Sequence, residues 1–475
     1  MSAISSPTYD PKSTAEGLAN NYIAPAQNLI DTQTAKAKAT ATALTTLGSA
    51  LSDFQSTLAG LTSSTTTVAA NSAAFSNTAI GTATADANAV AGTYSFYVEQ
   101  LATAGQVSYN VNDSAAAGAG SMNIMLADGS SFQVDLANAD SNGDGTLTAK
   151  EIAAAVNASA TNNSRITAST LTINGQSTLL LKSADTGVAN GITSIDTSGL
   201  GNSALASALG TPKVLATAAD AVVWLGGTSG TKIQQASNTF KIIDGVSFTV
   251  TQASATTTPT TLTVISDPTS TAANVQKFLT AYNTLLGVFT TLTAVGDHTI
   301  APAPSTDPNA PPTPVSQDAA FHGDSGVVSL RDRISNALRA ATGGISLINF
   351  GISASKKDGT LTLDPARLNK TIANNPGTLD KLFGRAGIGV DSGVLGTMNK
   401  LVNSWTSSAG GFINQRKDAV TKQQSDLGDR QIAVTAQFNS AYKRYLAQFT
   451  ALQQIQSSMG STSDMFTALF SDSKS

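Results

Sequence analysis

The chain has 475 residues, which is enough for several domains, because one hydrophobic core rarely grows beyond about 250 residues. Only 12% of the residues are charged, about half the usual share, and the net charge of -4 comes without a long run of Lys or Arg, which argues against nucleic acid as a partner. The absence of cysteine excludes disulfides, thiolate nucleophiles and cysteine-ligated zinc.

The sequence gives no sign of membrane contact. It starts with Met-Ser-Ala-Ile-Ser-Ser-Pro, which lacks the basic region and apolar core of a cleavable signal peptide. No apolar stretch approaches the roughly 20 residues that span a bilayer, and no basic surface is expected for anionic lipid. Secretion, if it occurs, must therefore use another route.

The first segment, to about Ala74, predicts a helix. Leu44, Leu51 and Leu58 belong to an apolar stripe with alternating steps of three and four residues, which is the period of one helix face. Pro25 is expected to start or kink a turn. Apart from alanine, the intervening residues are mostly Thr and Ser, which favour a helix weakly, so this helix needs a partner.

The last segment predicts that partner. A helix that leaves the body and another that returns can pair as a stalk, with the middle of the chain as an insertion. The apolar residues of the second helix recur every seven residues and then more densely, as in a coiled-coil seam: Ile413, Val420, Leu427, Val434, Phe438, Phe449 and Met459.

Between these helices, three β-rich blocks alternate apolar and polar residues and are separated by turns that contain glycine. The simplest topology makes the first and third blocks one discontinuous β domain, into which the second block is inserted. We expect strands at 92–101, 122–126, 131–136, 166–173, 178–182, 239–251 with a turn at Asp244-Gly245, and 259–266, and one short helix at 149–158.

Helical periodicity returns at 275–289 and again at 326–339. The segment between them, 300–314, is so rich in proline that we expect an exposed spacer. A small strand pair at 350–363 and a helix at 365–373 precede the long C-terminal helices.

The sequence therefore predicts an α+β multidomain protein, with a terminal α-helical coiled-coil stalk and discontinuous, nested β-rich head domains. The expected domains are a terminal helical leg (1–40 with 435–475), a helical stalk domain with a small β element (41–75 with 268–434), a discontinuous β domain (76–110 with 214–267), an inserted outer β-rich domain (111–213) and the proline-rich loop (300–314).

The inventory of catalytic groups is thin. Two histidines, His298 and His322, flank the proline-rich loop, and no nucleophile elbow, phosphate-binding loop or His-Glu-x-x-His pair occurs. Acidic residues are scattered singly along turns. We therefore expect a protein that is not an enzyme.

One local pattern is specific for a metal. The twelve residues from 140 to 151 match the calcium loop of EF-hand and dockerin-like modules. The expected oxygen ligands are Asp140, Asn142, Asp144, Thr146 through its carbonyl, Thr148 through water, and Glu151. The alternative is a turn rich in Asp, Asn and Gly that caps the following helix. Calcium would be structural, and no cofactor is otherwise expected.

Several motifs, in order, resemble those of one known family. They include Gly-Thr-Tyr-Ser-Phe-Tyr-Val-Glu-Gln within 91–102 and Gly-Ile-Ser-Ala-Ser-Lys-Lys-Asp-Gly-Thr within 351–364. The other matching stretches are 243–248, 261–267, 278–283, 322–325, 375–383 and 445–449 with Met459. Nearly the whole chain thus resembles the flagellar filament cap family, or hook-associated protein two family. It departs at its start, where the family has a Gly-Ser-Gly-rich opening, and at the calcium-like loop.

The resemblance implies an extracellular protein of the bacterial flagellum that leaves the cell unfolded through the flagellar type III export apparatus. It implies a ring of several copies, often five, at the filament tip, which helps exported flagellin to fold and insert. Flagellin, the hook–filament junction proteins and an export chaperone for the C-terminal helix are the partners it suggests.

In that family the terminal helices form legs that point into the filament. We predict that eight residues carry the packing of these legs, although an intramolecular bundle explains the same stripes: Leu44, Leu51, Leu58, Val420, Leu427, Val434, Phe438 and Phe449. A second hypothesis is a calcium-stabilised surface adhesin on a coiled-coil stalk, which would bind a host mucin or glycan.

Overall fold

The computed structural model describes residues 10–111, 114–115, 119–173, 175–296, 318–339, 346–387 and 391–471, so the proline-rich loop at 300–314 lies outside the described residues. The chain forms two compact units. The helical unit comprises the residues up to Ser63 and those from Ala272 on, and the β unit comprises Ser64–Thr271. The α+β multidomain fold class is thus confirmed. None of the described helices combines the length and the apolar character that crossing a bilayer demands.

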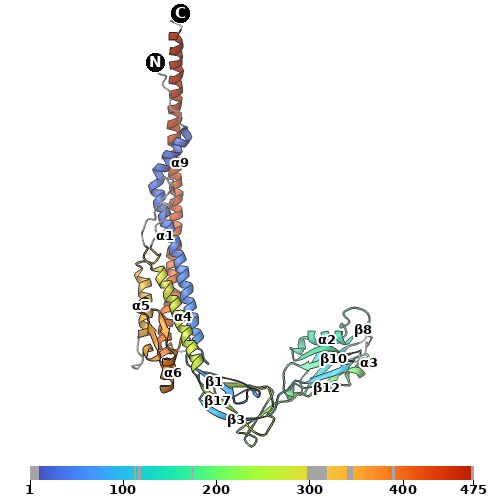
Figure 1. Cartoon of the computed structure of the whole chain (residues 1–475). Helices are drawn as coiled ribbons and strands as arrows, with labels where there is room; N and C mark the ends of the chain where they lie inside the picture. The colour runs from blue at the N-terminus through green and yellow to red at the C-terminus, as the bar shows by residue number, and fades with distance from the viewer. Residues whose placement is uncertain are drawn as a thin grey trace. The chain divides into compact units, whose positions relative to one another are not determined.

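Two long helices dominate the helical unit. Helix α1 (Pro11–Leu61) and helix α9 (Phe412–Ser471) lie side by side and antiparallel, and α9 continues past the start of α1 (Figure 1). Asp10 caps α1, because its carboxylate accepts hydrogen bonds from the backbone N–H groups of Lys12 and Ser13, at 3.3 and 3.1 Å. The two terminal helices therefore form the expected stalk.

The first predicted segment differs from expectation at two places, its C-terminal end and Pro25. Helix α1 ends at Leu61 rather than near Ala74, because Thr62 is extended and the Ser and Thr residues after it have low helix propensity. Pro25 lies inside α1, so it does not start a turn. Ala19 and Ile30, on either side of it, are both buried, so packing holds the helix together across the proline.

Shorter elements surround the C-terminal half of α1. Their core contains Phe278, whose ring centroid lies 6.5 Å from that of Phe54 and 5.4 Å from that of Phe383. These elements are α4 (Pro268–Leu292), α5 (Ser325–Arg339), the 3-10 helix η3 (Leu347–Phe350), the hairpin of β18 (Ile352–Ala354) and β19 (Leu361–Leu363), α6 (Pro365–Asn374), α7 (Thr378–Phe383) and α8 (Gly393–Thr406).

In the β unit, two antiparallel sheets share one core. Phe248 lies at its centre, with ring centroids 4.8 Å from Phe96, 5.2 Å from Phe240 and 5.7 Å from Phe75. One sheet has the order β1 (Ala70–Phe75), β17 (Thr260–Asp267), β3 (Gly92–Gln100), β13 (Ala221–Leu225) and β14 (Thr231–Gln235), and the other has β15 (Thr239–Ile243), β16 (Val246–Val250) and β2 (Gly81–Ala85).

A second core within the β unit belongs to the residues inserted between β3 and β13, so the β domains are nested as predicted. Its elements are a sheet of β12 (Lys213–Ala216), β4 (Gln106–Asn110), β10 (Gln176–Ser183) and β9 (Ile166–Ile173); a sheet of β11 (Ile192–Asp196), β6 (Ser121–Leu126) and β7 (Ser131–Asp135); the pair β5 (Ser114–Ala115) and β8 (Thr146–Leu147); the helices α2 (Ala149–Ala158) and α3 (Ser203–Leu209); and the 3-10 turns η1 (Ala160–Asn162) and η2 (Val188–Asn190).

Candidate assembly site: the paired terminal helices

The face of α9 that meets the rest of the helical unit repeats every seven residues. The side chains of this seam are all buried: Ile413, Val420, Leu427, Val434 and Ala441. A strict seven-residue repeat keeps one narrow stripe of a helix against its partner. The predicted seam of α9 is thus confirmed as buried from Ile413 to Val434, whereas Phe438 and Phe449 further along are only half-buried and Met459 is exposed.

The matching face of α1 is built largely from alanine. Before Leu44, the buried side chains of α1 are Ala15, Ala19, Ile30, Ala37 and Ala43. Small side chains allow two helices to approach closely but bury little apolar surface. Sequence reasoning missed these alanines because their apolar signal is weak, although the spacings 15 to 19 and 30 to 37 follow the helical period.

Polar contacts fix the register of the two helices. The side-chain amides of Gln27 and Gln431 exchange two hydrogen bonds, each 2.8 Å long. Further along, the guanidinium of Arg444 lies 6.0 Å from the ring centroid of Tyr22 and 5.0 Å from that of Tyr445. A sliding movement of α1 along α9 would break these contacts, so they select one alignment.

The predicted leg residues fall into two groups. Leu44, Leu51 and Leu58 are fully buried. However, the part of α1 that holds Leu51 and Leu58 runs beside α8. A hydrogen bond shows this contact, in which Gln55 Nε2 donates to Asn399 Oδ1 at 3.2 Å. These two leucines therefore belong to the core of the helical unit, whereas Val420, Leu427 and Val434 belong to the seam.

Phe438 and Phe449 are half-buried on α9. The ring of Phe438 stacks on that of Tyr442, with centroids 6.1 Å apart. Whether any of the eight residues packs the legs of an assembled particle stays a prediction.

Beyond the start of α1, the same face of α9 becomes exposed. Ile455 and Leu469, which are 57% and 64% exposed, stand two and four heptads after Ala441. The other large apolar side chains that are exposed in this segment, residues 452–469, are Leu452, Met459, Met465 and Phe466. A long exposed apolar stripe of this kind is typical of surfaces that contact another protein.

The predicted calcium loop is a tight turn. The two oxygens of Asp140 accept hydrogen bonds from the N–H groups of Gly143 and Gly145, at 2.8 and 2.9 Å. Asp144 accepts from the N–H and hydroxyl of Thr146, and from Asn142 Nδ2. These bonds, with that of the Thr146 hydroxyl largest, lower the pKa of Asp144.

Glu151 joins this turn to α2. One of its oxygens accepts from the N–H and hydroxyl of Thr148, which caps α2, and the other from those of Ser141. Within the described ranges, no three His, Cys, Asp or Glu side chains are arranged to hold a metal ion. The geometry favours the capping alternative, and calcium binding stays a prediction.

Of the two histidines named as candidate catalytic groups, the described residues include only His322. His322 Nε2 lies 4.0 Å from Asp318 Oδ2, and both side chains are exposed to solvent. His298 lies outside the described residues. The described part of the chain thus gives no catalytic geometry from which to derive a reaction.

Two family models match the chain. The model described as Flagellar hook-associated protein 2 C-terminus matches residues 218–461, and the one described as Flagellar hook-associated protein 2 N-terminus matches residues 8–105. The residues between these ranges, 106–217, are nearly those of the inserted second core.

Two curated relatives match over most of their length. The chain is 30% identical over 446 residues to the B-type flagellar hook-associated protein 2 of Pseudomonas aeruginosa, covering 89% of this chain and 88% of the relative. It is 29% identical over 404 residues to the lateral flagellar hook-associated protein 2 of Vibrio parahaemolyticus, covering 83% of this chain and 85% of the relative.

A solved structure shares the fold. The D1-D2-D3 domains of the flagellar cap protein FliD from Escherichia coli superpose with a TM-score of 0.59 and 23% identity. The match covers 80% of this chain and 99% of that one. At this level of identity the match supports the fold alone.

Proposed function

Because this chain belongs to the flagellar hook-associated protein 2 family, we propose that it caps the flagellar filament, as an oligomeric ring at the filament tip that promotes folding and insertion of exported flagellin. The ring holds several copies, five by the family resemblance, and the protein is extracellular after type III export. No catalytic step is part of this function. The comparisons give no support to the adhesin hypothesis.

The exposed apolar end of α9 is the observation that carries this proposal. A stripe that is buried as far as Ala441 and exposed from Leu452 on indicates a helix that is half anchored in its own chain and half available to other subunits. A cap must hold a tip that it can also leave, and a narrow apolar seam suits such reversible contact.

The test is filament growth in a strain that lacks the gene. We expect the null strain to shed unpolymerised flagellin into the medium and to lose motility, and we expect the full chain to restore both. A chain cut after Gly411 loses all of α9, including the buried seam residues, so its failure would mix misfolding with lost assembly.

A chain that ends at Thr450 separates these effects. It keeps the seam from Ile413 to Ala441 and removes only the exposed stripe. The proposal predicts that this chain folds, with an unchanged melting temperature, but fails to restore filaments. Normal filaments in the null strain would refute the cap function, and full restoration by the shortened chain would refute the role of the stripe.

A further inference from the structure

The helical unit contains a groove of about 610 Å³ between α4, α5 and the β18–β19 hairpin. Its walls are mostly apolar. Leu338, Leu347, Ile352 and Leu361 are buried side chains that line it, and Leu286 is half-buried. A volume of this size, with apolar walls and a few polar groups, is typical of a binding site.

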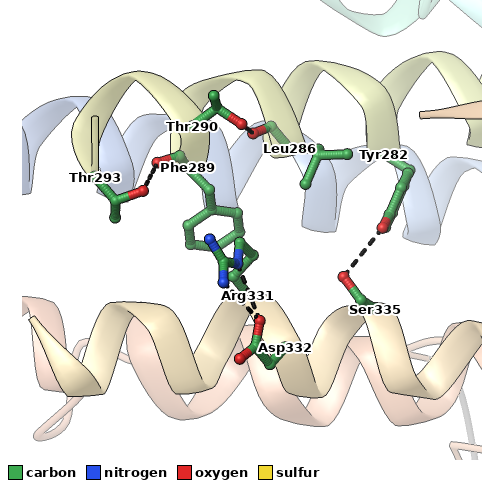
Figure 2. A network of polar contacts seen from close by, with 8 residues as sticks. All are labelled: Tyr282, Leu286, Phe289, Thr290, Thr293, Arg331, Asp332 and Ser335. Carbon is green, nitrogen blue, oxygen red and sulfur yellow. Dashed lines mark hydrogen bonds and ion pairs between the residues drawn. The ribbon is translucent and has the colours of Figure 1, made fainter. Parts of the chain in front are cut away.

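The polar groups between the two long walls are already engaged. Figure 2 shows Tyr282 of α4 facing Ser335 of α5, with 3.2 Å between the two hydroxyl oxygens. The hydroxyl of Thr290 donates to the carbonyl oxygen of Leu286, in its own helix, at 2.9 Å. The Tyr282–Ser335 contact therefore ties the two walls together, and because these hydroxyls already have partners, the groove offers mainly apolar surface to a ligand.

The shape of the groove is elongated. Its lining runs from Tyr282 to Thr290 along α4 and from Arg331 to Arg339 along α5. Eight residues of helix rise by about 12 Å, which is a little more than two helical turns. Ile348, also in the lining, is 63% exposed and thus adds an accessible apolar edge.

Three charged side chains line the groove. Arg331 forms an ion pair with Asp332, with 2.9 Å between Nη2 and Oδ1. Asp358 accepts from the hydroxyl and N–H of Thr360, at 2.7 and 3.1 Å, and hydrogen bonds from Thr360 and Ser355 lower its pKa to about 2. Arg339 is exposed at the C-terminal end of α5. Among the described lining residues, the ionised Asp358 and Arg339 therefore present opposite charges, and Arg339 is the one that suits a carboxylate of a partner.

We propose that this groove binds an amphipathic helix of an incoming filament subunit, with apolar side chains at i, i+3 or i+4, and i+7 in the groove and a carboxylate opposite Arg339. A helix with that spacing presents its anchors over two turns, which matches the length of the groove. That the helix comes from a filament subunit rests on the proposed cap function. The kind of side chains that the helix carries is inferred from the groove alone.

Fluorescence anisotropy with the full chain tests this chemistry. The first probe is a fluorescein-labelled synthetic helix with Leu at the anchor positions and Glu beside them, and the second has Lys in place of Glu. We expect the Glu helix to bind more tightly. Arg339→Glu should weaken its binding about tenfold and should strengthen binding of the Lys helix. Ile348→Asp should weaken both.

Arg333→Glu is the matched control, because Arg333 is exposed on the same helix but does not line the groove. It should leave binding of both helices unchanged. All the substituted side chains are exposed, so melting temperatures should equal that of the wild type. Equal binding of the two helices, or equal effects of Arg333→Glu and Arg339→Glu, would overturn the groove chemistry.

Competition and filament growth assign the partner. Purified flagellin monomer from the same organism should displace the Glu helix from the wild type. Failure to displace it would overturn the identity of the partner. If the wild-type gene restores filaments in the null strain and Ile348→Asp restores them equally well, the cap function stands and the inference about the groove fails.

Discussion

Helix α1 packs in two different ways along its length. From Leu44 to Leu61 its buried side chains are mostly leucine, with Phe54, inside the core of the helical unit. From Pro11 to Ala43 they are four alanines and one isoleucine against α9, while Leu29 is 56% exposed. A single helix therefore joins a segment with a large apolar core to one with a thin seam.

This difference indicates that the two halves of α1 contribute unequally to the stability of the fold. Burial of a leucine side chain contributes roughly 1.5–3 kcal/mol, whereas an alanine has few apolar atoms to bury. The first half of α1 should thus open locally at a lower free energy than the second half. A leg that separates from its partner helix without unfolding the body of the protein would have this construction.

The largest effect is expected in the core segment. Leu51→Ala should lower the free energy of unfolding by about 3 kcal/mol, because Leu51 is fully buried and the change leaves a cavity. Leu29→Ala, on the exposed face of the same helix, should cost less than about 0.5 kcal/mol. Urea unfolding followed by circular dichroism measures both. Equal losses would contradict the division of α1 into two segments.

The stability of the α1–α9 seam should depend more on keeping its side chains small than on the apolar surface that they bury. Ala37→Leu places a large side chain into a close contact and should destabilise the helix pair by about 1–3 kcal/mol. Ala39→Leu is the control, because Ala39 is exposed on the same helix. Hydrogen exchange should show faster exchange in residues 11–43 for the first variant alone, while the core segment keeps its protection.

The ion pair between Asp324 and Arg416 fastens α5 to α9 at the base of the seam, with 2.8 Å between Nη1 and Oδ2. Burial raises the pKa of Asp324, but hydrogen bonds from Arg416 and from the N–H of Val327 outweigh burial and lower it. Asp324→Asn should cost about 1–2 kcal/mol at pH 7.

That cost depends on pH in a defined direction. A lowered pKa means that the carboxylate stabilises the fold above its unfolded-state value of 3.8, and that this contribution is lost as the pH falls through the folded-state pKa. The difference in the free energy of unfolding between wild type and Asp324→Asn, measured by urea unfolding, should therefore become smaller below pH 4. Asp332→Asn, at an exposed pair, should change stability little at any pH.

The substitutions above all lie in the helical unit, so they should leave the stability of the inserted β domain unchanged. If Asp140, Asn142, Asp144, Thr146 and Glu151 do bind calcium, the ion should raise the melting temperature and slow exchange in α2, without affecting the helix pair. Asp144→Ala should abolish the response, whereas Asp128→Ala, in another turn of the same domain, should retain it. If calcium does not raise the melting temperature of the wild type, the hypothesis of a calcium site is wrong.

Periodic segments of the sequence predicted their structures closely. The helix at 149–158 and the strand at 166–173 match α2 and β9 at both ends, and the Asp244-Gly245 turn joins β15 to β16. Strand β13 was missed, because Ala-Val-Val-Trp-Leu lies between two other strands and lacks alternation. The alanine face of α1 was missed for a related reason, since contact there depends on small size and not on hydrophobicity.

The length of α9 has a mechanical consequence. Its 60 residues form one uninterrupted helix, so the direction of the exposed stripe is fixed by the phase of the buried seam far below it. Each inserted residue turns everything beyond it by about 100°, whereas seven residues turn it by only about 20° short of full circles. The number of residues in α9 therefore sets the direction in which the exposed stripe points relative to the buried seam.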